Sequence, residues 1–254
     1  MKIILSPAKM MRCLPKAQYT LPMNLANAQY LQKILSKWTL KDFEQKMKLS
    51  RAKAIETKQM IQEWHALQDQ KQLTPALFAY MGEAFKALDA VSCDQKALSY
   101  FNQNTFVFSG IYGLLRATDG IAPYRLEMAQ KMTLSKTQAS LYTFWRPKVE
   151  LLLHELLSAD ERLLNLASSE YSDLIQDDAI KSKMVTPVFK EHKAGKIQSI
   201  SVFSKQARGT MARWCANQGL EDITQIKNFK ELGYCFDASL SDQSNYYFVR
   251  TEAQ

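Results

Sequence analysis

Glycine and proline are scarce in this sequence, with 8 and 7 copies among 254 residues. So few turn-forming residues exclude long low-complexity segments, and no stretch rich in Gly, Pro or Ser divides the chain. Hydrophobic residues make up 46% and charged residues 23%, close to the average of globular proteins. A chain of this length buries a large share of its apolar surface on folding. We therefore expect one globular domain spanning residues 1–254.

Cysteine is also scarce, and its four copies are widely separated: Cys13, Cys93, Cys215 and Cys235. No CxxC spacing occurs, which excludes a dense disulfide framework and a zinc knuckle. We expect buried free thiols in a reducing compartment. The three histidines lie far apart, and carboxylates are not paired at metal-ligand spacing. We therefore predict no metal site and no cofactor.

Long apolar runs are absent. The first residues contain too short a run for a signal peptide, and no segment approaches the length of a membrane span. This predicts a cytoplasmic protein with no membrane association, and nothing indicates an obligate protein partner. The familiar phosphate-loop, dinucleotide-binding, zinc-protease and serine-hydrolase motifs are missing as well. A binding protein is therefore favoured over an enzyme, and no residue is assigned a catalytic role.

The hydrophobic pattern predicts a mixed α/β (α+β) fold, in which a mixed β-sheet is surrounded by helices. Helical spacing of apolar residues runs from Leu25 to Gln68, and Thr39 and Ser50 suit helix N-caps. A hairpin is expected around Ala194-Gly195. Further helices are predicted over Pro75–Leu88, Leu141–Leu157 and Lys205–Gln218, and strands over Lys2–Leu5, Phe106–Phe108, Leu163–Ala167, Met184–Phe189, Ile197–Phe203, Tyr234–Phe236 and Tyr246–Val249.

Positive charge exceeds negative charge, with 33 Lys and Arg against 25 Asp and Glu, and this favours polyanionic partners. Most of the excess lies in residues 1–60. Four of these cations surround the joint between two predicted helices: Lys46, Lys48, Arg51 and Lys53. Helix-turn-helix and helix-hairpin-helix modules present such basic joints to DNA backbones. The usual hairpin glycine is missing, and a plain helical hairpin with exposed lysines explains the pattern as well.

The segment Ser109–Met128 contains three of the eight glycines together with charged and aromatic residues. Arginine forks suit phosphate, tyrosine rings suit stacking, and glycine permits close backbone approach. This mixture indicates an anion or nucleotide pocket, although a buried structural network needs the same residue types. The side chains concerned are Tyr112, Arg116, Asp119, Tyr124, Arg125 and Glu127.

The predicted helix Lys205–Gln218 has a basic side. At 100° per residue, Lys205, Arg208 and Arg213 lie opposite the apolar residues of the helix. These cations suit a phosphate backbone. A solvated amphipathic face accounts for the same pattern, so the helix alone does not decide between binding and solvation.

Several unusual blocks occur in one order from the first residues to the last predicted strands, and together they resemble the YaaA family. The most distinctive are Tyr-Gly-Leu-Leu-Arg at 112–116 and Pro-Tyr-Arg-Leu-Glu-Met at 123–128. The others are Ser-Pro-Ala-Lys at 6–9, Asn-Leu-Ala-Ser-Ser-Glu-Tyr at 165–171, Ala-Arg-Gly at 207–209 and Gly-Tyr at 233–234.

The resemblance implies resistance to hydrogen peroxide, limitation of free intracellular iron, and DNA binding by a compact mixed α/β fold that includes a helix-hairpin-helix element. This chain has Phe85 and Phe203 where the family tends to have tyrosine, so no hydroxyl role is carried over there. Carried over residue by residue, the family's polar cleft maps to Lys9, Tyr112, Arg116, Asp119, Tyr124, Arg125, Glu127, Glu170, Lys205 and Arg208.

Two hypotheses for function follow. In the first, the protein binds double-stranded or distorted DNA through a basic cleft. It thereby protects DNA and helps to limit free iron. Its expected DNA contacts are Lys9, Tyr112, Arg116, Arg125, Lys205, Arg208, Arg213, Lys46, Lys48, Arg51 and Lys53, with polar pocket residues Ser6, Asp119, Tyr124, Glu127 and Glu170.

The second hypothesis is an enzyme of unassigned reaction that acts on a nucleotide-like or phosphorylated ligand. Its pocket would be formed by Lys9, Tyr112, Arg116, Arg125 and Glu127. A continuous basic groove favours DNA binding, whereas a small closed pocket with convergent polar groups favours a small ligand.

Overall fold

The computed structural model describes residues 1–14, 18–69, 72–132, 134, 138–193 and 196–251. Within them, eight strands form one mixed sheet in the order β4-β3-β1-β6-β7-β10-β9, with β8 paired to β7. The strands are β1 (Lys2–Leu5), β3 (Thr105–Ser109), β4 (Gly113–Arg116), β6 (Leu163–Leu166), β7 (Met184–Lys193), β8 (Lys196–Gln198), β9 (Cys235–Asp237) and β10 (Asn245–Thr251).

The centre of the sheet is parallel. Strand β1 pairs in parallel with β3 on one side and β6 on the other, so that Ile4 lies between Phe106 and Asn165. Strands β6, β7 and β10 continue the parallel pairing, while β4, β8 and β9 are antiparallel to their neighbours. Parallel strands are covered on both faces, which explains why Lys2–Leu5 is a nearly continuous apolar run.

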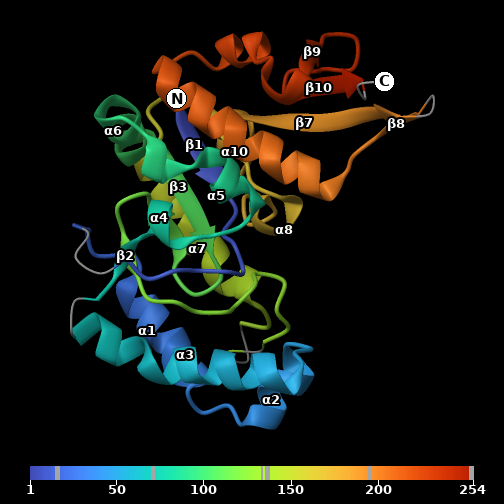
Figure 1. The fold of residues 1–254 in the computed structure, drawn as a ribbon. Coiled ribbons are helices and arrows are strands. Elements are labelled where there is room, and N and C mark those ends of the chain that lie inside the picture. The colour runs from blue at the N-terminus through green and yellow to red at the C-terminus, as the bar shows by residue number, and fades with distance from the viewer. Residues whose placement is uncertain (15–17, 70–71, 133, 135–137, 194–195, 252–254) are drawn as a thin grey trace.

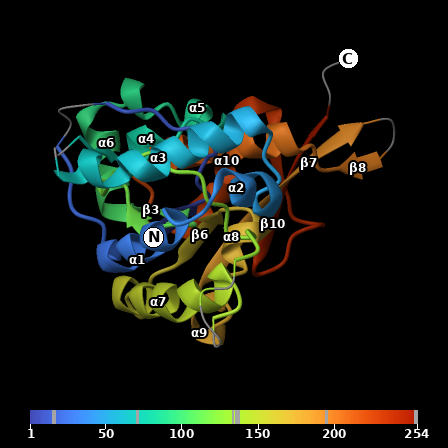
Figure 2. The same ribbon diagram turned by 90° about the horizontal axis from the view of Figure 1, so that it is seen from below.

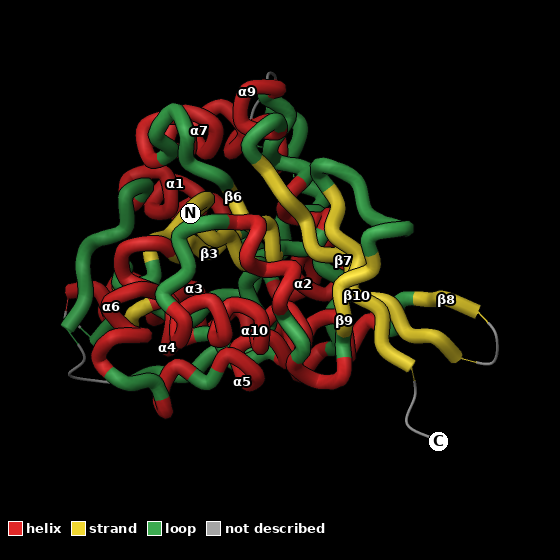
Figure 3. The backbone as a smooth tube through the Cα atoms, turned by 90° about the horizontal axis from the view of Figure 1, so that it is seen from above, coloured by secondary structure: helices red, strands yellow, loops and turns green. Residues whose placement is uncertain are grey.

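Helices cover both faces of the sheet. Figures 2 and 3 show α10, α5, α4 and α6 on one face and α7 and α9 on the other, and Figure 1 shows α1–α3 below the sheet. The helices are α1 (Leu25–Leu35), α2 (Leu40–Lys46), α3 (Arg51–Asp69), α4 (Ala76–Ala79), α5 (Glu83–Leu88), α6 (Gln95–Asn104), α7 (Leu141–Leu156), α8 (Ser169–Ser172), α9 (Asp178–Lys181) and α10 (Ser201–Gln218). A small second sheet pairs β2 (Thr74–Pro75) with β5 (Gly120–Ile121).

The expected mixed α/β fold is confirmed, and so are most of the predicted elements. Buried apolar residues from all of these helices and from the sheet form one continuous core. In the described part of the chain, no helix combines the length and the apolar character needed to cross a membrane.

Both predicted N-caps before α2 and α3 are present. The Thr39 hydroxyl accepts from the amide of Asp42 at 3.2 Å, and the Asp42 carboxylate accepts from the amide of Thr39 at 2.8 Å. The hydrogen bond from Thr39 and the neighbouring Lys46 hold the pKa of Asp42 well below its usual value. The Ser50 hydroxyl accepts from the amide of Lys53 at 3.5 Å. These side chains satisfy amides that the first helical turn leaves exposed.

Two predicted elements differ in the structure. The single helix expected over Pro75–Leu88 is divided into α4 and α5 by an extended residue, Tyr80, where the amide of Met81 donates to the carbonyl of Met10. The strand expected over Ile197–Phe203 ends at Gln198, and α10 begins four residues before the predicted start. The apolar residues of this segment do not mark the buried face of a strand, because Ile197 and Val202 are exposed. The predicted turn at Ala194-Gly195 lies outside the described residues.

The joint between α2 and α3 spans residues 47–50. Its Lys48 has φ of 51°, in the left-handed region that hairpin glycines normally occupy. The chain therefore makes a tight turn at the predicted place without glycine. The helix-hairpin-helix assignment itself stays a prediction.

The four cysteines are free, but the expectation of buried thiols holds for Cys215 alone. Burial raises the pKa of Cys215 to about 12. Cys13 and Cys235 are exposed because they lie on a surface loop after β1 and on the edge strand β9.

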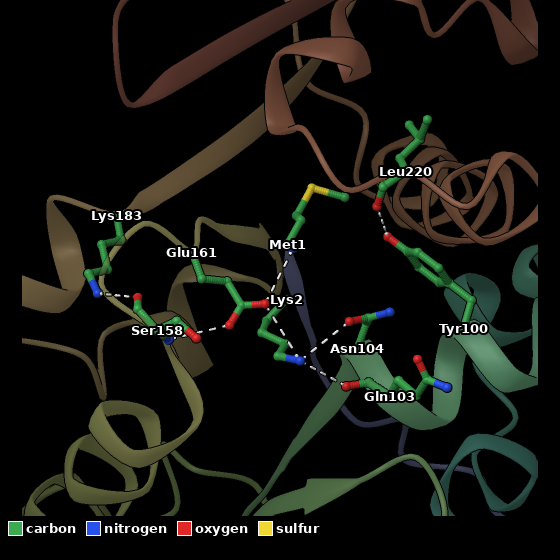
Figure 4. A network of polar contacts seen from close by, with 9 residues as sticks. All are labelled: Met1, Lys2, Tyr100, Gln103, Asn104, Ser158, Glu161, Lys183 and Leu220. Carbon is green, nitrogen blue, oxygen red and sulfur yellow. Dashed lines mark hydrogen bonds and ion pairs between the residues drawn. The ribbon is translucent and has the colours of Figure 1, made fainter.

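A polar network fixes the amino end of β1 (Figure 4). The terminal ammonium of Met1 and the amine of Lys2 lie 3.3 and 3.5 Å from the Glu161 carboxylate, which precedes β6. The Lys2 amine also donates to the carbonyl of Gln103 and the side chain of Asn104 at the end of α6. These contacts tie β1 to the segments on both of its sides.

Helices α5 and α10 pack with their backbones in close contact at Gly209. A Cβ added there would lie 1.9 Å from the carbonyl oxygen of Ala84. The small residue therefore sets the distance between the two helices.

We predict that Gly209→Ala destabilises the protein by about 3 kcal/mol, because the added methyl group must push α5 away from α10. Chemical denaturation measures the free energy of unfolding. Gln218→Ala, on an exposed position of α10, is the control and is expected to change stability by less than about 0.5 kcal/mol. Equal effects of the two changes would contradict the role of Gly209.

Candidate functional site

A cavity of about 330 Å³ lies where β1 and β6 end, lined by Leu5 and Leu166, the last residues of these two strands, and by Ser6 directly after β1. From β1 the chain continues toward β3, whereas from β6 it continues toward β7 on the opposite side. Neighbouring parallel strands whose connections diverge leave a crevice beyond their carboxyl ends, and open α/β sheets bind ligands there. The position of the cavity therefore follows from the order of the strands.

The two strand ends are joined directly at this crevice. The amide of Ser168 donates to the Ser6 hydroxyl at 2.8 Å, and the two serine hydroxyls are 3.1 Å apart. Each serine closely follows a strand in the sequence. That position is the sequence feature from which the contact between their hydroxyls could have been predicted. Ser6 was expected at the site, whereas Ser168 was missed.

The cavity is lined by apolar and by charged side chains. The apolar and aromatic side chains come from β1 and the segment after it, β6, α5 and the segment before it, α8 and the segment after β5. Phe85 and Tyr171 among them were not predicted. The lining includes Leu5, Met10, Met81, Phe85, Tyr124, Leu126, Leu166 and Tyr171, together with the charged residues Lys9, Glu83, Arg125, Glu127, Glu170, Lys205 and Arg208.

Arg208 is the unusual residue of this lining. Its Nε is buried and has no hydrogen-bond partner among the residues that the structure describes. Burial lowers the pKa of its guanidinium, and no nearby carboxylate offsets this effect. A charged group that is removed from water without a partner is costly, and an anion in the cavity would supply the missing acceptor.

The carboxylates at the cavity are committed to other groups. Glu127 pairs with Lys9 at 2.8 Å, and Glu83 pairs with Lys86 at 3.2 Å. Glu170 accepts from a backbone amide at 3.3 Å. The pKa of Glu83 is lowered by a hydrogen bond from Gln206 and by Lys86 and Lys205.

Buried hydroxyls form a chain behind the cavity. The Tyr124 hydroxyl lies 2.7 Å from that of Ser109 and 2.8 Å from that of Tyr80. Burial raises the pKa of Tyr124 to about 12, raises that of Tyr80 well above 10, and also raises that of Tyr171. These tyrosines stay protonated at neutral pH, and Tyr124 and Tyr171 line the cavity.

Two of the expected site residues form a separate network. The Arg116 guanidinium donates to the fully buried carboxylate of Asp119 at 2.8 and 2.9 Å, and also to the carbonyl of Leu21 at 2.7 Å. Thr20 donates to the same carboxylate. Neither Arg116 nor Asp119 lines the cavity. Their contacts fasten the Leu21 segment to the turn after β4, and a contribution to DNA binding stays a prediction.

Tyr112 and Arg213 also lie outside the cavity lining. Tyr112 is fully buried, and its hydroxyl accepts from the amide of Ala122. The Arg213 guanidinium donates to the carbonyls of Leu88, Asp89 and Ser92, where α5 ends. Both side chains form hydrogen bonds with the backbone that stabilise the fold. The cavity therefore brings together Ser6, Lys9, Tyr124, Arg125, Glu127, Glu170, Lys205 and Arg208 from the expected set.

The basic joint of α2 and α3 lies beside the loop that carries Glu127. The side-chain amide of Gln130 donates to the carbonyl of Lys46 at 2.7 Å. Arg51 and Lys53 make exposed ion pairs with Glu44 and Glu56, and Lys46 pairs with Asp42. Such exposed pairs are weak and break easily in favour of a phosphate. Lys48 is exposed at the tip of the joint.

Among the described residues, no group of three or more His, Cys, Asp or Glu side chains is placed to hold a metal ion. The polar groups of the cavity instead suit an organic or inorganic anion, with cations at its mouth and an apolar wall behind them.

A sequence model described as "Peroxide stress protein YaaA" matches residues 1–240 of the chain. The chain belongs to this family. The YaaA-family chain is 35% identical over 253 residues to a UPF0246 protein of Flavobacterium johnsoniae, which covers 98% of the chain and 100% of the relative. It is 35% identical over 255 residues to one of Chromobacterium violaceum, covering 98% and 99%. The resemblance to the YaaA family is thereby confirmed.

A further UPF0246 protein, from Neisseria meningitidis serogroup B, is 32% identical over 257 residues and covers 99% of both chains. The matches to relatives run through the whole fold of the YaaA-family chain, including both strand ends that form the cavity. A role in peroxide stress is consistent with this membership.

We predict that Tyr124→Phe destabilises the YaaA-family chain by about 1–2 kcal/mol, because Ser109 and Tyr80 lose a buried hydrogen-bond partner. The folded pKa of Tyr124, about 12, exceeds the unfolded value of about 10. Its stabilising contribution is therefore complete below pH 10 and is lost as the pH rises through 12.

Denaturant unfolding at pH 7, 10 and 12 measures both effects. The variant should lose less stability than the parent between pH 10 and 12. The exposed Tyr30, changed to Phe, serves as the control. If Tyr124→Phe left both the stability at pH 7 and the alkaline slope unchanged, the buried hydroxyl chain would not have the role described.

Proposed function

We propose that this protein binds DNA in the cytoplasm as part of the peroxide response, protecting the DNA and helping to limit free iron. The observation that carries DNA binding is the group of cations that line the cavity, Arg125, Lys205 and Arg208, whose neighbouring carboxylates are already paired with other groups. Cations that line an open cavity can neutralise phosphates.

The second contact surface is the joint of α2 and α3, with Lys46, Lys48, Arg51 and Lys53. It is linked to the cavity mouth through the loop that contains Glu127 and Gln130. A duplex backbone that crosses the mouth would meet phosphate-binding groups on both sides of this loop. Two separated sets of cations support binding to an extended polyanion.

Limitation of free iron enters the proposal through family membership, and we assign no residue to it. DNA bound by the protein would be shielded from iron-dependent oxidants at the contact region. Iron limitation and DNA binding are therefore measured separately.

We predict that Arg125→Ala and Lys205→Ala each weaken binding to a duplex and reduce the slope of log affinity against log salt by about 1, because each change removes one phosphate contact. Fluorescence anisotropy at several salt concentrations measures this slope. Lys96→Ala is the matched control, because Lys96 lines a different groove near Met1 at the other end of β1. Affinity that is independent of salt, or lost equally in the control, would contradict the proposal.

The joint is tested by Lys48→Gly. We predict weaker duplex binding with a change in stability of less than about 1 kcal/mol, because relief of the left-handed backbone offsets the greater freedom of glycine in the unfolded chain. Binding and thermal unfolding are measured on the same preparation. Unchanged affinity in the folded variant would remove the joint from the proposed interface.

A further inference from the structure

Binding of a duplex backbone leaves the interior of the cavity without an occupant. Phosphates on a duplex surface can meet exposed cations of the lining such as Lys205, but the lining also contains apolar and aromatic side chains such as Phe85 and Leu166. An apolar wall with a few polar groups at its rim is the usual composition of a site that encloses a small organic molecule.

The cations that line the cavity favour an anion as its occupant. Arg208 has a buried Nε without an acceptor, and burial lowers its guanidinium pKa. Lys205, one turn earlier on α10, and Arg125 line the same space. Phosphate suits arginine forks, since several of its oxygens accept hydrogen bonds at once.

The charge balance limits how many phosphates fit. Four cations, Lys9, Arg125, Lys205 and Arg208, line the cavity with three carboxylates, Glu83, Glu127 and Glu170, which leaves one net positive charge. A single phosphate suits this balance, whereas a triphosphate would meet like charge from the carboxylates. The cavity volume of about 330 Å³ is also at the small end of the range for ligand sites, about 300–1,000 Å³.

We propose that the cavity between the ends of β1 and β6 holds one nucleotide unit, with its phosphate on Arg208 and Lys205 and its base against the apolar wall. Bases stack on aromatic side chains whatever their sequence, so Phe85 and the neighbouring tyrosines suit this role. The unit has two sources with the same chemistry, a free nucleoside monophosphate or an unpaired nucleotide of a DNA strand. Only the second source rests on the proposed function.

The position of the cavity supports the same conclusion independently of charge. It occupies the crevice where the connections from β1 and β6 diverge, and nucleotides bind at such crevices in open α/β sheets. Ser6, whose hydroxyl lies 3.1 Å from that of Ser168, lines the cavity directly after the end of β1.

Isothermal titration calorimetry with AMP, adenosine, inorganic phosphate and ATP tests the proposal on the intact protein. AMP is expected to bind at least about tenfold more tightly than adenosine or phosphate alone, because each lacks one half of the recognised unit. ATP is expected to bind more weakly than AMP. Phosphate binding as tightly as AMP would overturn the assignment of the apolar wall to the base.

Arg208→Gln tests the site. AMP affinity should fall by about tenfold or more, while the free variant melts at the same temperature as the parent or higher, because a poorly compensated buried charge has been removed. A purely structural arginine would give the opposite pattern, lower thermal stability with AMP binding retained. Lys96→Gln is the control and should change neither quantity.

The two sources are separated with a fully paired duplex and the same duplex carrying one unpaired nucleotide. Tighter binding of the second duplex, lost in Arg208→Gln and competed by AMP, assigns the site to a DNA strand. AMP binding without this preference assigns it to the free nucleotide. If the duplex binds but neither AMP nor the unpaired nucleotide does, the inference is overturned and DNA binding stands. If AMP binds but no duplex does, the inference stands and the proposed DNA binding is overturned.

Discussion

The position of β1 between β3 and β6 is the constraint on which the rest of the molecule depends. This four-residue strand is fixed at its amino end by the contacts of Met1 and Lys2 with Glu161 and, by pairing, along both of its edges. Its carboxyl end therefore reaches Ser168 in one defined register. Because the residues after β1 also pair with the segment between α4 and α5, the same short strand positions both the floor and one side of the cavity.

The buried cation of α10 shows how the site departs from an ordinary protein interior. Most charged side chains of the chain are paired or exposed, and Arg213, on the same helix, satisfies three backbone carbonyls. Arg208 instead lines the cavity with a buried Nε that has no hydrogen-bond partner among the described residues. Leaving this donor unpaired costs folding free energy, and under the proposal an anion bound in the cavity would offset that cost. This difference in hydrogen bonding is why the proposed binding site includes Arg208 and leaves out Arg213.

Sequence patterns predicted most strands of the main sheet, the caps at Thr39 and Ser50 and the mixed fold, because these depend on local periodicity and local hydrogen bonds. They did not predict the strand order, which depends on pairing between distant segments and which creates the crevice. The same limit explains why Arg116 and Arg208 looked alike in sequence. Tertiary contacts decide whether an arginine meets Asp119 or lines the cavity, and the same kind of contact brings Phe85 into the lining.

The contact between Gly209 and Ala84 has a consequence for how this site can change in evolution. Helix α10 supplies two of the four cations of the cavity and α5 supplies part of its wall, so the distance between these two sides of the cavity is held by two main chains rather than by interchangeable side chains. Substitutions in the lining can alter which molecule is preferred while the span between the helices stays constant. Relatives that retain this glycine are thus free to diverge in selectivity without rebuilding the scaffold.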